Sequence, residues 1–201
     1  MNFDEISNAV EVFDEIMHDS LPSFFDELAA NPCYVREREI VSLFAFGHLV
    51  PQFVRWNLDL RQIGIEYPVI QVQQSIEHKP RVLKDLVAWP RVGATLWNGY
   101  QPLAVVEWKN ASLVTPAADV VGVLKGYAKD VQWLRTNRKF MQVGYACLVT
   151  RGESGLTLSC IRIKDDSKSR FIDLPAVLAS PIPAQGVQTL VDEIAVSSEG
   201  G

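Results

Sequence analysis

Cysteine and histidine are scarce in this chain of 201 residues, which contains three of each. The cysteines, Cys33, Cys147 and Cys160, are far apart and form no Cys-x-x-Cys pair. This spacing argues against a disulfide framework or a cysteine zinc site and predicts buried thiols in a reducing cytoplasm. The histidines show no paired spacing, so we expect satisfied core groups rather than metal ligands; they are His18, His48 and His78.

Other common signals are also missing. No stretch approaches the roughly 18 consecutive apolar residues that suggest a membrane span. The start, Met1–Glu5, is acidic and lacks the basic-then-apolar layout of a secretory signal. Neither Gly-x-x-x-x-Gly-Lys nor Gly-x-Gly-x-x-Gly occurs, so nucleotide cofactors are unsupported. Because 48% of the residues are hydrophobic and 21% are charged, we expect a cytoplasmic globular protein with no membrane partner.

Residues 1–30 carry eight acids and no Lys or Arg. Taking these eight from the 24 acids of the whole chain leaves 16 acids against 19 Lys and Arg in residues 31–201, a net charge of +3. The body of the protein is therefore mildly basic, which is compatible with a polyanionic partner. Its densest basic cluster includes Lys125, Lys129 and Arg135, for which a solvated helix face is the alternative reading.

Apolar periodicity divides the chain into alternating helices and strands. Helices are expected at 3–18, at about 23–30 after a break at Leu21-Pro22, at 34–50, at 115–135 and at 187–196. Strands are expected at 63–74, 81–89, 104–109, 140–150 and 156–163, with a further strand at 170–174 left open. This order predicts an α/β fold with a central mixed β-sheet flanked by helices. The expected domains are an acidic helical arm at 1–30, an α/β domain at 31–196 and a flexible tail at 197–201.

Two charges two residues apart end an apolar strand, Ala104-Val105-Val106-Glu107-Trp108-Lys109. Side chains at positions i and i+2 of a strand point to the same face, so Glu107 and Lys109 should project together, opposite Val106 and Trp108. Charges inside a sheet are costly unless they are paired or bind a metal. A metal-assisted hydrolytic site explains this pattern, and a purely structural ion pair is the alternative.

Asp85 interrupts another apolar strand, Val82 to Val87. If the Asn98-Gly99 turn sets the register of a hairpin, and Pro90 adds a bulge, Asp85 falls opposite Asn110. Asp85 would then lie at the same end of the sheet as Glu107 and Lys109. Two carboxylates near one lysine suggest a hard-cation site, because Mg²⁺ takes one or two carboxylates plus waters and a substrate phosphate. A structural Asp85–Lys109 salt bridge is again the alternative.

Asp85 followed by Glu107-Trp108-Lys109 at the end of an apolar strand resembles the PD-(D/E)xK, restriction-endonuclease-like nuclease superfamily. The helix expected at 34–50 is similar to the family's first core helix, which often supplies a glutamate. The helix containing Leu124-Lys125-Gly126-Tyr127-Ala128 and the strand at 141–150 resemble the next two core elements. The residue before Asp85 is Lys84, so the literal Pro-Asp pair is missing.

This resemblance, which covers roughly residues 34–150, implies a restriction-endonuclease-like core and a set of site residues. Asp85, Glu107 and the carbonyl of Trp108 would bind Mg²⁺, for which Mn²⁺ can substitute. Lys109 would be the catalytic lysine. Glu37 or Glu39 would be an accessory acid, and the sequence does not choose between them.

The resulting hypothesis is a Mg²⁺-dependent nuclease that hydrolyses phosphodiester bonds in DNA, most simply an endonuclease. Lys125, Lys129 and Arg135 are its candidate nucleic-acid contacts, and a homodimer would suit cleavage of both strands. The alternative is a weak or inactive nuclease-fold protein that acts as an interaction module. In that case the acidic arm would dock a protein partner.

Overall fold

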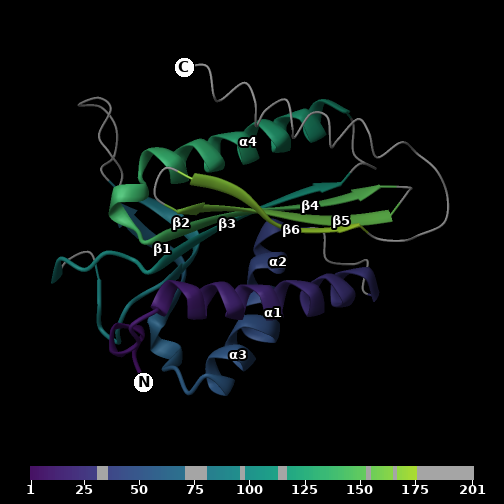
Figure 1. Cartoon of the computed structure of the whole chain (residues 1–201). Coiled ribbons are helices and arrows are strands. Elements are labelled where there is room, and N and C mark those ends of the chain that lie inside the picture. Colours follow the sequence, from purple (N-terminus) through teal and green to yellow (C-terminus); the bar gives the residue numbers. More distant parts are fainter. Residues whose placement is uncertain are drawn as a thin grey trace.

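The computed structural model describes residues 1–30, 36–70, 81–95, 98–112, 117–152, 155–164 and 167–175. These residues form a six-stranded mixed sheet between two helical layers (Figure 1). The coarse α/β prediction is therefore confirmed. In this part of the chain, no helix is both long enough and apolar enough to cross a membrane.

The six strands lie side by side in the order in which they occur in the chain, from β1 to β6. Its strands are β1 (Ile63–Ile70), β2 (Arg81–Ala88), β3 (Ala104–Ser112), β4 (Val143–Gly152), β5 (Gly155–Lys164) and β6 (Ser167–Pro175). Only β3 and β4 pair in parallel among these neighbours. A parallel pair needs a crossover connection, and helix α4 (Ala117–Thr136) supplies it. The strand that the sequence left open at 170–174 lies within β6.

The first helical layer starts with a short 3₁₀ turn, η1 (Phe3–Glu5), and the long helix α1 (Ala9–Ala30). The predicted break at Leu21-Pro22 is wrong, because α1 continues through Pro22. A proline inside a helix removes one backbone hydrogen bond. Burial of Leu21 and Phe24 in the core on either side of Pro22 offsets that loss.

Two short α-helices, α2 (Glu37–Leu43) and α3 (Val50–Arg55), are joined by a π-helical turn, η2 (Phe44–Leu49). The helical segment extends past the predicted end at 50, because Pro51 lies in the first turn of α3, where its missing N–H costs little. Side chains tie η2 to α1: Ser23 Oγ lies 2.9 Å from His48 Nδ1, and His48 Nε2 lies 2.9 Å from Glu27 Oε2.

The sheet separates two apolar cores. Figure 1 shows the helical layers on its two sides, α1–α3 and α4. The larger core lies between the sheet and α1–α3 and contains many aromatic side chains, among them Phe13, Phe24, Phe44 and Trp108. The smaller core lies between the sheet and α4. The two thiols within the described residues, Cys147 and Cys160, are buried on β4 and β5, as the sequence predicted.

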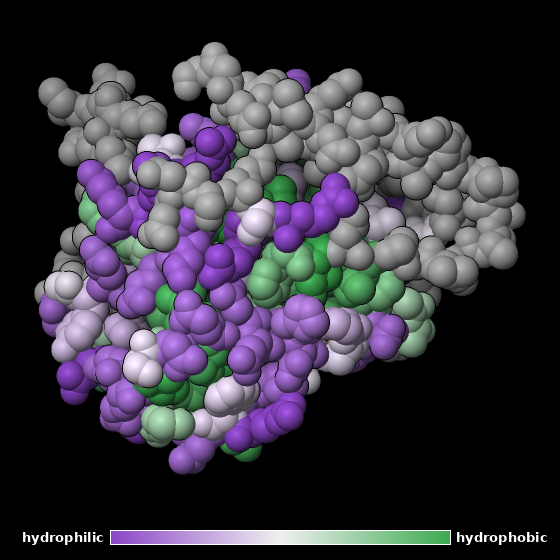
Figure 2. Space-filling view, viewed as in Figure 1, coloured by the Kyte–Doolittle hydropathy of each residue, from purple (hydrophilic) through white to green (hydrophobic). Residues whose placement is uncertain are grey.

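Residues 1–30 form part of the larger core. Ten residues of α1 are buried, and Asp14 accepts hydrogen bonds from Tyr145 of β4 and Arg162 of β5 at 2.6 and 2.7 Å. The lower half of Figure 2, which the α1–α3 layer occupies, is mainly hydrophilic. Acids such as Glu15 and Asp26 are exposed on α1, whereas Asp14 points to the sheet, so the helix that carries the acidic charge is also one that the domain core needs.

The connection from β2 to β3 differs from the predicted hairpin. Asn98-Gly99 does form a turn, in which Tyr100 N donates to Thr95 O at 3.3 Å, but the described residues next to it belong to no strand, since β2 ends at Ala88 and β3 begins at Ala104. The ladder pairs Leu86 with Val106, so the predicted pairing of Asp85 with Asn110 is wrong. The connection leaves the sheet because other segments bind its ends, for example through the hydrogen bond from Asp4 N to Pro90 O.

Several sequence predictions lie outside the described residues. They are the helix at 187–196, the tail at 197–201, the strand residues 71–74, the helix start at Thr115-Pro116, the thiol of Cys33 and the side chain of His78.

Candidate active site

The end of β3 presents its side chains to opposite faces of the sheet, as the alternation of the sequence predicts. Trp108 packs in the larger core, with its ring centroid 5.2 Å from that of Phe24 and 4.9 Å from that of Phe44. Glu107 and Lys109 point to the other face, toward α4, since Lys109 Nζ lies 3.2 Å from Asp130 Oδ2 of that helix. The aromatic contacts of Trp108 thus fix the orientation of the two charged neighbours.

Asp85 lies beside this strand end despite the change in register. Trp108 N donates to Asp85 Oδ2 at 2.7 Å. The side chain takes the place of a backbone acceptor, and the regular β2–β3 ladder accordingly stops at Leu86. On the other side of Asp85, Glu66 of β1 has a left-handed φ of 50°. The distortion of both strands at this point leaves the second oxygen of Asp85 with no hydrogen-bond partner among the described residues.

Three oxygens surround the ammonium group of Lys109. Its Nζ donates hydrogen bonds to Glu37 Oε1 at 3.0 Å and Trp108 O at 2.9 Å, and it forms an ion pair with Asp130 Oδ2 at 3.2 Å. Burial by itself would lower the pKa of Lys109, but Asp130 and Glu37 more than offset it and hold the pKa above its ordinary value. Lys109 therefore stays charged at neutral pH.

Glu107 is the most deeply buried carboxylate of the group, with 5% of its surface exposed. Its partner is Lys84 of β2, with which it forms an ion pair. Burial raises the pKa of Glu107 to about 8; Lys84 opposes this shift and the negative charge of Asp85 adds to it. A carboxylate in such surroundings binds either a proton or a cation readily.

The structure distinguishes between the two candidate glutamates of α2. Glu37 begins the helix and contacts Lys109. Burial raises the pKa of Glu37, and the ion pair with Lys109 lowers it only in part. Glu39 instead accepts a hydrogen bond from Arg36 N at 3.2 Å and so caps the first turn of α2. Only Glu37 reaches the cluster.

Sequence reasoning missed two members of the cluster, Lys84 and Asp130. Lys84 was noted only as a departure from a Pro-Asp pair, although its place in an apolar strand was a signal of its own. Asp130 was overlooked among the basic residues of α4. It lies three residues from the buried Tyr127, so it adjoins the apolar stripe of the helix, and burial raises its pKa.

The candidate nucleic-acid contacts lie on α4. Lys125 and Lys129 are exposed, whereas Arg135 is half-buried. Between the two lysines, Gly126 lies against the site, because a Cβ on it would lie 3.4 Å from Lys109 Cε. Lys125 and Lys129, four residues apart, therefore lie together on one face of α4, beside the edge that covers Lys109.

The cluster has four carboxylates, from Glu37, Asp85, Glu107 and Asp130, and two ammonium groups. This excess of acids favours the uptake of a cation or protons. The described residues contain no group of three or more His, Cys, Asp or Glu side chains arranged to hold a metal ion. The candidate oxygen ligands for a metal ion are the carboxylates of Asp85 and Glu107 and the carbonyl of Trp108.

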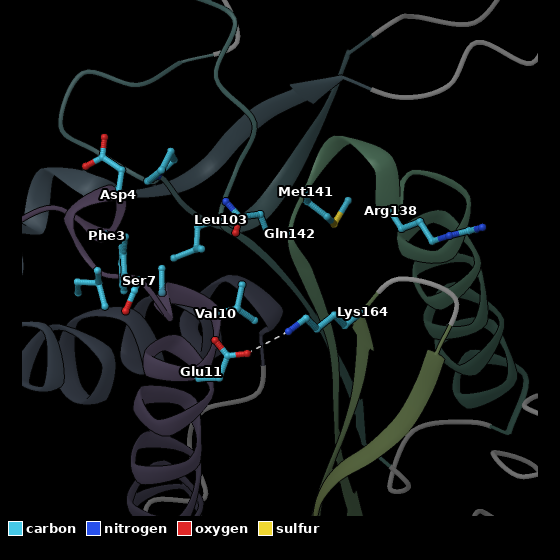
Figure 3. Close-up of a pocket in the computed structure, with 13 residues that line it drawn as sticks. Phe3, Asp4, Ser7, Val10, Glu11, Leu103, Arg138, Met141, Gln142 and Lys164 are labelled. Atoms are coloured by element: carbon cyan, nitrogen blue, oxygen red, sulfur yellow. Dashed lines mark hydrogen bonds and ion pairs between the residues drawn. The ribbon is translucent and has the colours of Figure 1, made fainter.

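A cavity of about 470 Å³ lies elsewhere in the domain (Figure 3). Its lining includes Leu103 before β3, Gln142 before β4 and Lys164 at the end of β5, and it contains no member of the carboxylate–lysine cluster. Lys164 forms an ion pair with Glu11 at its rim. The cavity and the cluster are separate features.

Comparisons with models of protein families, with characterised proteins and with solved structures found no match to this chain.

Proposed function

We propose that this protein is a Mg²⁺-dependent nuclease of the PD-(D/E)xK, restriction-endonuclease-like type, which hydrolyses phosphodiester bonds in DNA as an endonuclease. The observation that carries the proposal is the meeting of Asp85, Glu107 and Lys109 at one end of β3, with Glu37 of α2 bound to the lysine. These residues come from three separate elements, so their meeting is not a consequence of sequence proximity.

The order of elements supports the same proposal. A helix that supplies a glutamate (α2) precedes the strand with Glu107 and Lys109, and a helix (α4) then leads to a neighbouring strand, β4. This is the order on which the resemblance to the nuclease superfamily rests. Fold alone does not fix function, so the proposal depends on the chemistry of the site.

The donor atoms suit a hard divalent cation. Mg²⁺ prefers oxygen ligands and commonly uses one or two carboxylates together with waters and a substrate phosphate. Asp85, with one oxygen free of partners within the described residues, and Glu107 would hold the ion, with the Trp108 carbonyl as a third ligand. When bound, the ion would supply an activated water and would neutralise charge on the scissile phosphate.

The surroundings of Lys109 define its role in the proposed reaction. Its raised pKa keeps the ammonium protonated in the metal-free protein, which favours a role as a cation over one as the base that removes a proton from water. A charged lysine held by Glu37 and Asp130 would instead orient the attacking water and stabilise the negative charge of the transition state. Glu37 and Asp130 act through Lys109 and are positioning residues.

The flanking lysines supply contacts for the substrate backbone. Lys125 and Lys129 project from the edge of α4 next to the site, where cations favour a phosphate backbone. Substitution of either lysine should weaken DNA binding without preference for sequence.

Cleavage assays test the proposal. The purified full chain is incubated with supercoiled plasmid, linear duplex and single-stranded DNA in Mg²⁺ or Mn²⁺. We expect nicking or cutting of the plasmid that EDTA abolishes and that Lys109→Ala reduces by roughly 100-fold or more. Lys164→Ala, which removes a lysine outside the cluster, is the matched control and should retain activity. Cleavage that survives Lys109→Ala would contradict the assignment.

The second candidate is an inactive nuclease-fold protein that acts as an interaction module. The ion pair between Lys84 and Glu107 favours it, because a cation of the chain already contacts a proposed metal ligand. It predicts no cleavage of any DNA form and no binding of Mn²⁺ by calorimetry.

A further inference from the structure

Lys84 is a buried cation in the middle of the sheet. Only 6% of its surface is exposed. Its Nζ lies 3.6 Å from the centroid of the Trp133 ring of α4, and it forms an ion pair with Glu107. The lysine is thus held from two sides, by the face of an aromatic ring and by a carboxylate.

The face to which Lys84 points depends on the distortion at Asp85. Leu86, two residues along β2, packs in the larger core on the opposite side of the sheet. In a regular strand Lys84 would share that side. The irregular stretch at Asp85 and Glu66 turns Lys84 toward α4 instead. The same distortion therefore brings both Asp85 and the Lys84 ammonium to Glu107.

A metal ion and the Lys84 ammonium cannot both neutralise Glu107 without conflict. An ion bound to the Glu107 carboxylate would lie within a few ångströms of a buried positive charge. Repulsion between such charges is strong where water is excluded. Because Lys84 is buried, its ammonium group cannot easily turn into solvent to avoid this repulsion.

We propose that Lys84 is an internal competitor of the divalent metal, which holds Glu107 in the metal-free protein and thereby weakens metal binding. This inference rests on the proposed nuclease function, since it concerns the same site. Lys84 acts through Glu107, and Trp133 keeps its ammonium in place.

Titration calorimetry with Mn²⁺ alone tests the inference, on the full chain without DNA and at a pH just above 8, where Glu107 is ionised. Lys84→Gln removes the charge but keeps a donor for the Glu107 carboxylate, and we expect it to bind Mn²⁺ at least about tenfold more tightly than the unaltered protein. Lys84→Arg, the matched control that keeps the charge, should not bind more tightly. Glu107→Gln should abolish the heat of binding in both backgrounds, which locates the ion at this site.

A second variant covers the case in which Lys84→Gln does not fold. Trp133→Leu leaves both charges in place but removes the ring that holds the ammonium, so it should also tighten Mn²⁺ binding, by a smaller factor. Circular dichroism and thermal unfolding establish that each variant is folded.

The outcomes separate the inference from the proposed function. Equal or weaker binding by folded Lys84→Gln, while the unaltered protein binds Mn²⁺ and cleaves DNA, overturns the role of Lys84 and leaves the nuclease. No binding by any variant, together with no cleavage, overturns both. Tighter binding by Lys84→Gln that Glu107→Gln eliminates supports the inference.

Discussion

At the scale of single residues, Glu107 connects the site to the stability of the fold. Its pKa rises from an ordinary value of 4.5 to about 8, mainly because the side chain is buried. Between these values the folded protein binds a proton that the unfolded chain releases. The stabilisation is therefore complete below about pH 4.5 and is lost as the pH rises through 8.

We predict that Glu107→Gln removes this dependence, because the amide does not titrate. From pH 5 to pH 8.5, the free energy of unfolding of the unaltered protein should fall relative to that of Glu107→Gln by on the order of 3 kcal/mol. Urea denaturation of both proteins at several pH values measures the difference. Parallel curves across this range would show that Glu107 titrates normally in the folded state.

The positions of some side chains of the cluster could be predicted from the sequence, and those of others could not. The shared face of Glu107 and Lys109 follows from the geometry of any strand, so it was predictable. The choice of Glu37 over Glu39 was not, because it depends on where the first turn of α2 begins. Lys84 was hidden for a related reason: its direction depends on an irregular strand conformation that no periodicity encodes.

At the scale of elements, the close approach of α4 to β3 positions Lys109. Two glycines of α4 allow this to be tested. A Cβ at Gly126 would lie 3.4 Å from Lys109 Cε, whereas a Cβ at Gly122 would have no heavy atom within 4 Å. Only Gly126 therefore limits the size of the side chain that can face the site.

We predict that Gly122→Ala and Gly126→Ala each stabilise the protein, by up to about 1 kcal/mol, because alanine favours the helix. Gly126→Leu should displace the Lys109 side chain and reduce cleavage of DNA at least about tenfold, while Gly122→Leu should not. Chemical denaturation and plasmid cleavage measure the two effects. Equal activity of both leucine variants would show that α4 does not constrain Lys109.

The sequence was informative about where elements occur and less so about how they connect. Apolar runs located β1 to β5 closely, because burial of a strand requires such runs, whereas β6 was left open. The end of α1 was misplaced because Pro22 suggested a break, and tertiary packing of Leu21 and Phe24 outweighed that local preference. The β2–β3 register was misplaced because the β2–β3 connection binds η1, a contact between segments about 85 residues apart in the chain, such as Asp4 and Pro90.

At the scale of the whole molecule, the acidic region at residues 1–30 is both a proposed docking surface and a part of the core. A test of docking must therefore change its charge without removing its buried side chains. Phe3, Phe13 and Phe24 are fully buried, and Asp14 holds Arg162 through two hydrogen bonds of 2.7 Å. Removal of residues 1–30 would expose one side of the larger core and leave Arg162 without this partner.

We predict that a chain lacking residues 1–30 does not unfold cooperatively and binds hydrophobic dyes, since loss of several buried aromatic side chains exceeds the stability of a typical domain. Thermal unfolding and dye fluorescence measure this. Cooperative unfolding of the truncated chain would show that the region is a separable arm.

Because truncation is expected to destroy the fold, loss of partner binding on truncation could not identify a docking surface. Charge reversal at Glu15 and Asp26, which are exposed on α1, is the better test, because it alters the acidic face and keeps the core intact. An interaction module that docks through this face should lose its partner in the Glu15→Lys, Asp26→Lys protein, whereas a nuclease should keep its cleavage of DNA.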